Sequence, residues 1–454
     1  SASPRLRAPP APLLRAACAL SLALALLAAT CGYWSVARAE WLVAREDNPR
    51  RVEYEQRIVR GRILDREGAP LADVEVAPSG LVTRTYPVVE AAPVVGYASL
   101  RHGTGGIEAA FDGELRGEAG RSAWEAAWAD LLHRPPQGRD VQLSLDAGLQ
   151  RTAQRALVGR QGAAVLLDAR TGEVLAMASA PTFDPARLDE AWDQLREDPA
   201  APLVNRATQG LYQPGAALET VVLAEAVGRG LAYLTDPAQG VTDTVRVNDV
   251  EVGCLEEPPE LADLAAAYRS ACPGPFAALG EQLGEGGLSA AVTRWRLIEP
   301  PALEIPTEAG TWSPEDLRLE AMGQGSLTLS PLGMAQVAAA LANDGAIPPL
   351  HLVLRVEEPG DGWREPEPPG EPRSVVPPEM ARALLTAWSP YGPNILGHLG
   401  TAVAGQDRPP HAWFLGVAPA GSPRFAVAVL LEHPADPRRA AEVGRALLEA
   451  TLGE

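Results

Sequence analysis

The stretch Leu211–Val227, which reads LYQPGAALETVVLAEAV, joins a turn to an apolar repeat with helical spacing. Tyr-Gln-Pro-Gly predicts the turn, and the apolar repeat predicts a helix that begins near Gly215. Free N–H groups at a helix start can stabilise the oxyanion that forms when a nucleophile attacks a carbonyl. Ala216 holds the nucleophile's place, and Glu219 lies one turn later, where a general base would face it. The stretch therefore has the layout of an acyl-transfer site without the residues of one.

The chain of 454 residues contains no lysine, so every basic side chain is Arg or His. This excludes a Schiff base, a lysine general base and a lysine anion clamp. The 39 basic and 58 acidic residues give a formal net charge of −19, which argues against a nucleic-acid partner. The length allows two or three domains, and a hydrophobic content of 46% is ordinary for globular protein.

An uncharged apolar run, residues 16–37, follows an arginine-containing N-terminus and ends before Arg38. A helix of this length spans about 33 Å at ~1.5 Å per residue, enough to cross a hydrocarbon core of ~30 Å. We therefore expect a single-pass plasma-membrane protein, with residues 1–15 in the cytoplasm and the bulk of the chain outside. The alternative is a cleaved signal peptide, because Ala37-Arg38-Ala39 has the A-x-A form.

Beyond the anchor, the pattern divides the chain into a small mixed pedestal, residues 38–139, and a larger domain, residues 140–454. We expect an α+β fold in which the two ends of the larger domain build a central antiparallel sheet flanked by helices. The proline- and glutamate-rich segment 358–378 is expected to be loop. The predicted strands are the hairpins at 63–72 and 162–179 and the segments 397–403, 411–418 and 424–431; the predicted helices are 122–132, 147–158, 215–229, 261–269, 276–284, 331–343, 379–389 and 438–452.

The four cysteines fall into two groups. Cys18 and Cys31 lie in the apolar run and are interpreted as packing residues. Cys254 and Cys272 are expected outside the cell, where an oxidising environment favours a disulfide over free thiols. The six histidines are isolated in the sequence, without an H-x-x-x-H or H-E-x-x-H pair, so we expect no metal site and no cofactor.

Several motifs, in a consistent order, resemble those of class B penicillin-binding proteins, the membrane-anchored transpeptidases that cross-link peptidoglycan. The resemblance covers nearly all of the chain after the anchor. It implies a pedestal followed by a penicillin-binding transpeptidase domain. The segments that carry it are Arg60-Gly-Arg-Ile-Leu-Asp-Arg66, Val95-Gly-Tyr-Ala-Ser99, Gly103-Thr-Gly-Gly-Ile-Glu108, Leu143–Gln150, the hairpin 162–179, Pro181-Thr-Phe-Asp-Pro185, Gly323-Gln-Gly-Ser-Leu-Thr-Leu-Ser-Pro331 and His411-Ala-Trp-Phe-Leu-Gly416.

All three catalytic motifs of that family are altered in this sequence. The family places S-x-x-K, S-x-N and K-[ST]-G around one cleft. The first register reads Ala216-Ala-Leu-Glu219, so both the acylating serine and its lysine are replaced. The second register reads Ala271-Cys272-Pro273, and the third reads His398-Leu399-Gly400 before Thr401. We therefore expect no catalytic residues at these positions.

Four polar residues are expected to line the altered cleft: Glu219, Ser270, His398 and Thr401. Ser270 lies one position before the second register, but no base or oxyanion site is arranged for it. Glu219 and His398 are expected to face each other, because the family's two lysines do. They are interpreted as an ion pair or as polar filling of a vacated site; the alternative is an acid–base pair for another hydrolysis, aided by Thr401.

The resemblance leaves more than one class of function open. The first is a catalytically inactive transpeptidase homologue that acts as scaffold or regulator of a SEDS-type membrane glycosyltransferase, since class B relatives engage such enzymes without using the serine. The second is an active or rewired D,D-transpeptidase or carboxypeptidase. The third is a sensor whose cleft binds a muropeptide or β-lactam without reacting. The missing serine and lysine favour binding over catalysis. The expected partners are other cell-wall synthesis proteins, the membrane and peptidoglycan or a muropeptide.

Overall fold

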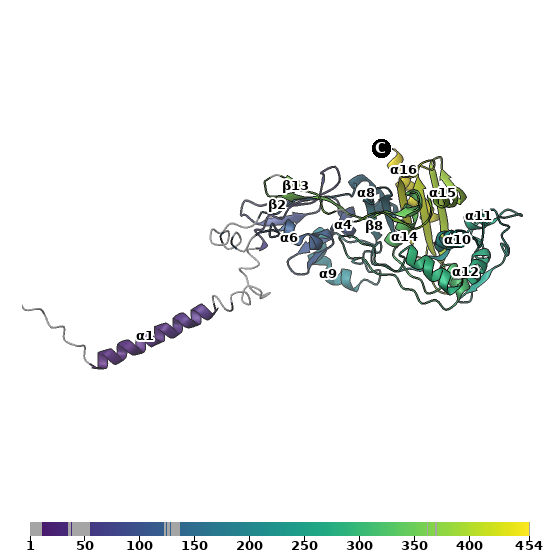
Figure 1. The fold of residues 1–454 in the computed structure, drawn as a ribbon. Coiled ribbons are helices and arrows are strands. Elements are labelled where there is room, and N and C mark those ends of the chain that lie inside the picture. Colours follow the sequence, from purple (N-terminus) through teal and green to yellow (C-terminus); the bar gives the residue numbers. More distant parts are fainter. Residues whose placement is uncertain are drawn as a thin grey trace, which may run out of the picture. The chain divides into compact units, whose positions relative to one another are not determined.

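The computed structural model describes residues 11–34, 38, 55–121, 124, 128, 137–360, 362–367 and 370–453. The chain divides into two compact units, residues 1–58 and 59–454, and each is described by itself. Figure 1 shows the course of the chain. The predicted helix at 122–132 lies mostly outside the described residues.

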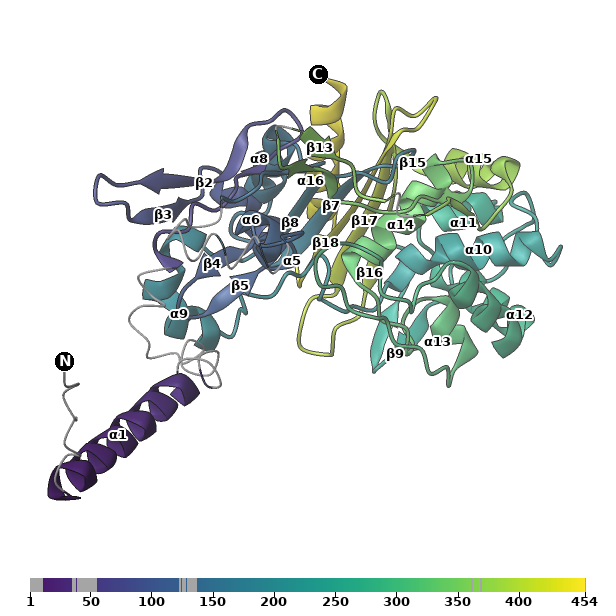
Figure 2. The ribbon, with the colours of Figure 1, turned by 60° about the vertical axis from the view of Figure 1, so that its left-hand side comes forward.

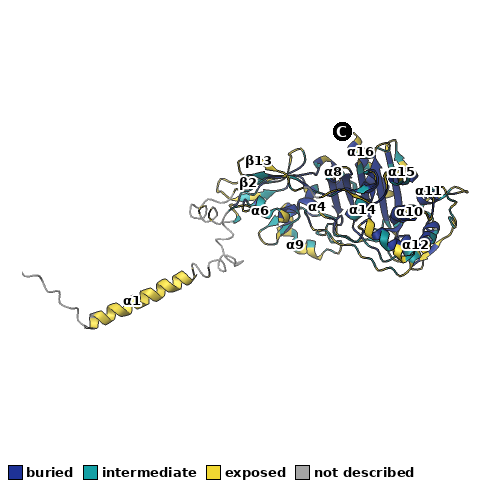
Figure 3. Ribbon diagram, viewed as in Figure 1, coloured by how far each residue is buried: buried dark blue, intermediate teal, exposed yellow. Residues whose placement is uncertain are grey.

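The first unit contains helix α1 (Ala11–Gly32). Its segment Leu14–Gly32 is long and apolar enough to cross a membrane, with a mean hydropathy of 1.9. The helix starts earlier than the predicted run 16–37, and residues 35–37 lie outside the described part. Its large apolar side chains are exposed, as the yellow helix in Figure 3 shows, which is the surface that a lipid environment would cover.

A six-stranded antiparallel sheet forms the centre of the second unit, and it confirms the expected α+β fold. Its order is β15-β16-β17-β18-β7-β8, so strands from both ends of the predicted larger domain lie side by side. The predicted hairpin 162–179 is present as β7 and β8. The bounds are β7 (Gly162–Asp168), β8 (Val174–Ala180), β15 (Ser389–Gly392), β16 (Ile395–Ala402), β17 (His411–Ala418) and β18 (Phe425–Leu431).

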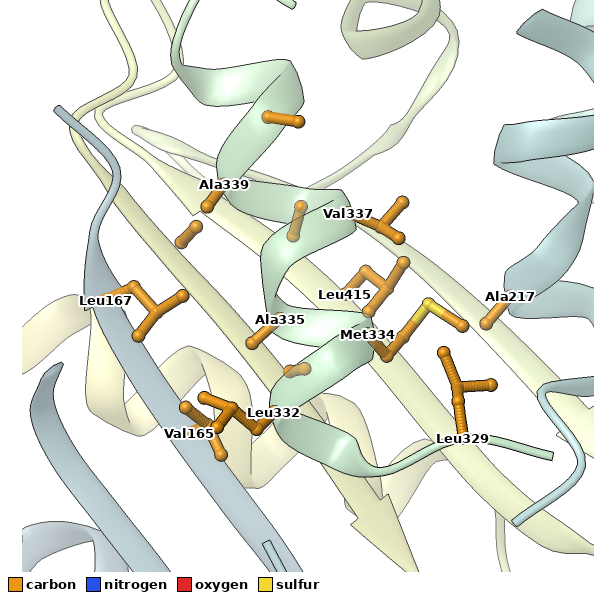
Figure 4. Close-up of a cluster of buried hydrophobic side chains, with 14 of the residues drawn as sticks. Val165, Leu167, Ala217, Leu329, Leu332, Met334, Ala335, Val337, Ala339 and Leu415 are labelled. Atoms are coloured by element: carbon orange, nitrogen blue, oxygen red, sulfur yellow. The ribbon is translucent and has the colours of Figure 1, made fainter. Parts of the chain in front are cut away.

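Helices cover both faces of this sheet (Figure 2). On β7, Val165 and Leu167 belong to one buried cluster, whereas the alternating Ala164 and Leu166 belong to another, as the period of two in a strand requires. Helices α8 (Ala147–Ala156) and α16 (Arg438–Leu452) pack on one face, and α14 (Pro331–Ala342) packs on the other. Figure 4 shows apolar side chains of α14 directed at β7 and β17.

A second six-stranded sheet forms the pedestal, in the order β13-β12-β6-β1-β2-β3. Three of its strands come from beyond residue 139: β6 (Val141–Leu143), β12 (Val353–Glu358) and β13 (Gly362–Arg364). The pedestal sheet therefore crosses the division at 139/140 that the sequence predicts, because β6 pairs in parallel with β1 and β12 extends the same sheet. The other strands are β1 (Ile63–Leu64), β2 (Pro70–Val76) and β3 (Val82–Thr85).

The expected loop 358–378 contains two short strands that the sequence analysis missed. Strand β13 pairs with β12, and β14 (Arg373–Ser374) pairs with β11 (Ala346–Ile347). Pairing with a strand that is already in place satisfies backbone groups whatever the local propensity, so the composition gave no signal. Helix α12 (Pro273–Arg294) also runs further than the predicted 276–284, past a break at Gly284.

The remaining elements connect the two sheets. In the pedestal they are η2 (Val89–Ala91), α4 (Ala92–Val95), β4 (Tyr97–Ser99), β5 (Gly103–Gly105), α5 (Ile107–Ala110) and α6 (Asp112–Leu115). Further along the chain they are η3 (Pro185–Arg187), α9 (Leu188–Glu197), η4 (Gly215–Leu218), α10 (Glu219–Gly228), β9 (Val245–Val247), β10 (Val250–Val252), α11 (Leu264–Arg269), α13 (Leu317–Ala321) and α15 (Pro378–Ala387).

Glu108 is a fully buried carboxylate that joins three parts of the pedestal. Arg60 Nη2 lies 2.9 Å from its Oε2, Arg84 Nε lies 2.6 Å from its Oε1, and Tyr86 donates to Oε1 at 3.3 Å. Replacing Glu108 with Ala removes the counter-charge of the buried Arg84 and leaves Arg60 with Asp112 alone, at 2.7 Å. Breaking a buried ion pair in this way costs about 3–5 kcal/mol. We expect the urea midpoint of Glu108→Ala to fall accordingly. Glu75→Ala, at an exposed pedestal position, is the matched control; equal midpoints for the two variants would contradict this role.

Candidate active site

The start of the predicted helix lies against the edge of the central sheet. It is a short 3₁₀ turn, η4, which continues as α10 from Glu219. Gly215 has φ +53°, donates to Gly323 O at 2.9 Å, and would bring a Cβ closer than 3.0 Å to Thr401 O. Gly400 on β16 has no room for a Cβ beside Ala217 N either. These glycines allow β16 and the helix start to touch backbone to backbone.

The structure brings three sequence-predicted residues together at this contact. Ala216 lies in the first turn, and Glu219 follows one turn later with an exposed fraction of 1%. From β16, His398 Nε2 lies 3.0 Å from Ala216 O and 3.9 Å from Glu219 Oε2. Because a carbonyl oxygen only accepts, His398 carries its proton on Nε2 and donates it to Ala216. The predicted facing of Glu219 and His398 is therefore present.

Burial favours the uncharged form of both side chains, although the 3.9 Å separation is short enough for an ion pair. Burial raises the pKa of Glu219 well above its usual range, which favours the protonated, uncharged carboxyl. Burial lowers the pKa of His398 to about 4, against the opposing effect of its hydrogen bond to Ala216. Neither Glu219 Oε2 nor His398 Nδ1 has a hydrogen-bond partner among the described residues. The geometry thus fits polar filling of a closed site.

Two aromatic residues, which the sequence analysis did not single out, enclose His398. The Tyr268 ring centroid lies 4.5 Å from the imidazole, and Trp388 stacks beyond at 6.5 Å. Trp388 Nε1 donates to Tyr268 Oη at 2.6 Å, and Tyr268 Oη lies 2.6 Å from Thr220 Oγ1. Burial raises the pKa of Tyr268, so its hydroxyl stays protonated. These residues come from α10, α11 and the end of α15, and their only sequence signal is their place in apolar helical stretches.

The second motif register packs beside this group through the start of α12. Ala271 has φ +49° and is buried, and Pro273 opens the helix. Between them, Cys272 forms a disulfide with Cys254. Ser270 is buried at the C-cap of α11, where its carbonyl accepts from Leu255 and Glu256. Among the described residues, its hydroxyl makes no hydrogen bond to Ala216, Glu219 or His398.

Gln324 holds the other end of the third motif register. Its Nε2 donates to Thr401 O at 3.0 Å, and its Oε1 accepts from Val403 N at 3.0 Å. It fixes the backbone of β16 where that strand leaves the sheet, and Thr401 contributes its backbone to this arrangement. The sequence signal was available: Gln324 is a lone polar residue between Gly323 and Gly325, a place where backbone approaches closely.

The family models match the two parts of the second unit in chain order. Residues 162–449 match the penicillin-binding protein transpeptidase domain, which is more than half of the chain. The chain belongs to the penicillin-binding protein transpeptidase family. Residues 60–141 match the penicillin-binding protein A dimerisation domain. The predicted resemblance is therefore confirmed, and homology places the chain with the class B members.

The individual relatives of this penicillin-binding protein homologue agree with that assignment. Peptidoglycan D,D-transpeptidase PbpA of Mycolicibacterium smegmatis is 31% identical and covers 97% of this chain and 99% of its own length. The Escherichia coli transpeptidase MrdA is 31% identical over 58% of this chain. Among solved structures, the ceftriaxone acyl-enzyme complex of penicillin-binding protein A from M. tuberculosis is 28% identical, with a TM-score of 0.79 over 88% of this chain and 100% of the other.

Proposed function

We propose that this penicillin-binding protein homologue serves peptidoglycan synthesis without acyl transfer, as a membrane-anchored scaffold or regulator of a SEDS-type glycosyltransferase. The observation that carries the proposal is Ala216, which stands at the helix start where an acylating nucleophile would be needed. In other enzymes, removing the nucleophile lowers kcat by roughly 10⁶. The relatives are named peptidoglycan D,D-transpeptidases, which supports a role in cell-wall synthesis. The missing nucleophile is the reason to propose that this chain does not share their acyl-transfer chemistry.

The neighbours of Ala216 support an inactive site. A general base must be deprotonated and must reach the nucleophile's proton. Burial raises the pKa of Glu219 and so disfavours its basic, deprotonated form, and His398 already donates its Nε2 proton to Ala216 O. The remaining imidazole lone pair, on Nδ1, is buried. No residue of this group is placed to activate an attacking atom.

The anchor and the pedestal are the parts that we assign to partner binding. We propose that α1 spans the membrane with residues 1–15 in the cytoplasm and that the second unit lies outside. Along the chain, we propose residues 38–139 as the pedestal and residues 140–454 as the transpeptidase-like domain, with strands β6, β12 and β13 of the latter completing the pedestal sheet. The apolar, exposed surface of α1 supports the first assignment, and the two family matches in this order support the second.

Co-purification tests the scaffold role. The full-length chain is co-expressed with a SEDS-type glycosyltransferase from the same genome and purified in mild detergent through a tag on the glycosyltransferase. We expect wild type and Ala216→Ser to co-purify equally, because the nucleophile position takes no part. A variant in which α1 is exchanged for an unrelated single-pass helix is expected not to co-purify with the glycosyltransferase. Recovery of wild type no greater than without the tag would contradict the scaffold role.

A further inference from the structure

A groove of about 1150 Å³ opens at one end of the central sheet and is lined by residues other than those of the Ala216 site. Its walls are the end of α8, the turn after β8 and the loop from β18 to α16. Much of this lining is apolar, including Leu157, Pro181 and Pro434. Small-molecule sites usually occupy about 300–1,000 Å³, so a groove of this volume fits a segment of a polymer.

Two side chains that line the groove each have a buried oxygen atom without a hydrogen-bond partner in the described part of the chain. Gln154 has an exposed fraction of 7%; its Nε2 donates to Ser179 O at 2.9 Å, and its Oε1 is one of the two atoms. The other is Thr182 Oγ1. An unsatisfied buried polar atom costs about 1–3 kcal/mol. A ligand that donates hydrogen bonds to these two oxygen atoms would remove that cost.

The charges at the groove balance one another. The acidic and basic side chains that line it each have an opposite charge or a backbone donor beside them, so the groove does not select for a charged ligand. The pairs are Glu432 with Arg206 at 2.8 Å, Arg439 with Glu442 at 3.0 Å, Arg160 with the same Glu442 at 4.0 Å, and Asp436 with the N–H of Arg438 at 3.0 Å.

Sheet register places the groove at the same end of the sheet as the Ala216 site. Ala402 pairs with His411, Ala412 pairs with Leu431, and Leu431 pairs with Gly162. The ends of β16 and β18 are therefore two strand spacings apart, about 10 Å. The rings of His411 and His433, 4.4 Å apart between centroids, lie between them. The groove and the Ala216 site therefore share one end of the sheet.

We propose that this groove binds a neutral strand of N-acetylated amino sugars, the glycan of peptidoglycan; the choice of this polymer rests on the proposed role in cell-wall synthesis. Sugar C–H faces cover the apolar lining. Hydroxyl and acetamide N–H groups donate to Gln154 Oε1 and Thr182 Oγ1. A neutral amino-sugar chain also matches the balanced charge of the groove.

Calorimetric titration of the full-length chain, in detergent micelles, with N-acetylglucosamine tetramer tests the proposal. We expect saturable binding in the submillimolar range. Ala435→Arg, which puts a long side chain on the exposed rim of the groove, should weaken binding at least tenfold. Ala77→Arg adds the same charge at an exposed pedestal position and should leave binding unchanged.

Thr182→Val separates a ligand contact from a structural role. It removes the unpartnered hydroxyl at nearly constant volume, so the free protein should unfold at the same or a higher urea concentration while the affinity falls several-fold. No binding of the tetramer, or equal binding by wild type and Ala435→Arg, would overturn the proposal. Either result would leave the co-purification outcome unaffected, so failure of the groove proposal and failure of the proposed function can be distinguished.

Discussion

Phe414→Ala is expected to lower the free energy of unfolding by about 3–5 kcal/mol, the usual cost of truncating a buried aromatic ring. Phe414 is fully buried on β17, between the sheet and α16. Three glycines make room for its ring: a Cβ on Gly397, Gly416 or Gly444 would lie closer than 3.0 Å to it. The backbones around this space are fixed by the sheet register and by α16, so they cannot collapse into the cavity.

Urea unfolding measures this effect, and glycine variants provide its controls. Gly444→Ala should also destabilise, by about 1–3 kcal/mol, because the added methyl group overpacks against the ring. Gly421→Ala, whose Cβ would meet open space, should change stability by less than about 0.5 kcal/mol. If Phe414→Ala unfolded at a urea concentration as high as that of Gly421→Ala, the proposed packing of the Phe414 ring against the three glycines would be contradicted.

The buried Glu219–His398 pair should give two pH dependences of opposite sign. His398 has a pKa of about 4 in the folded chain against its ordinary 6.5, so the unfolded state binds the extra proton between these values. Relative to His398→Gln, wild type should therefore lose about 3 kcal/mol of stability as the pH falls from 7 to 4. In Glu219 the folded pKa is raised, so the folded state holds the extra proton. Relative to Glu219→Gln, wild type should lose stability as the pH rises above 4.5.

Unfolding of the three proteins at pH 4, 5.5 and 7 measures both slopes, because differences between variants cancel all other titrations. Slopes of the same sign would contradict the neutral pair. If the free energy of unfolding at neutral pH were higher for wild type than for both His398→Gln and Glu219→Gln, the pair would instead be charged.

The predicted elements whose pattern repeats over several turns or strands are present in the structure. The hairpin at 162–179 and the closing strands carried clear alternation, and α14 and α16 carried clear helical spacing. The short strands β13 and β14 were missed because partner strands elsewhere in the chain decide their pairing. The same reason explains how β12 joins the pedestal sheet, some 210 residues after β6.

At the candidate site, the resemblance to the family located the altered motif positions and predicted that Glu219 and His398 face each other. They did not give the protonation states, which depend on how completely the site is buried. Tyr268 and Trp388 were missed, because an aromatic residue in an apolar helix reads as core until the structure shows what it encloses. Gln324 acts through its amide on backbone atoms about 80 residues away, which no local pattern encodes.

Acylation by a fluorescent penicillin, followed by intact mass, tests the central claim most directly. The full-length chain is incubated beside penicillin-binding protein A of M. tuberculosis, for which a penicillin G acyl-enzyme complex is known. An Ala216→Ser, Glu219→Lys, His398→Lys variant runs in parallel to ask whether the replaced side chains alone account for the loss. We expect a stoichiometric adduct on the mycobacterial protein and none on the wild-type chain. A stoichiometric adduct on the wild type would show that another residue serves as nucleophile, and would contradict the inactive site.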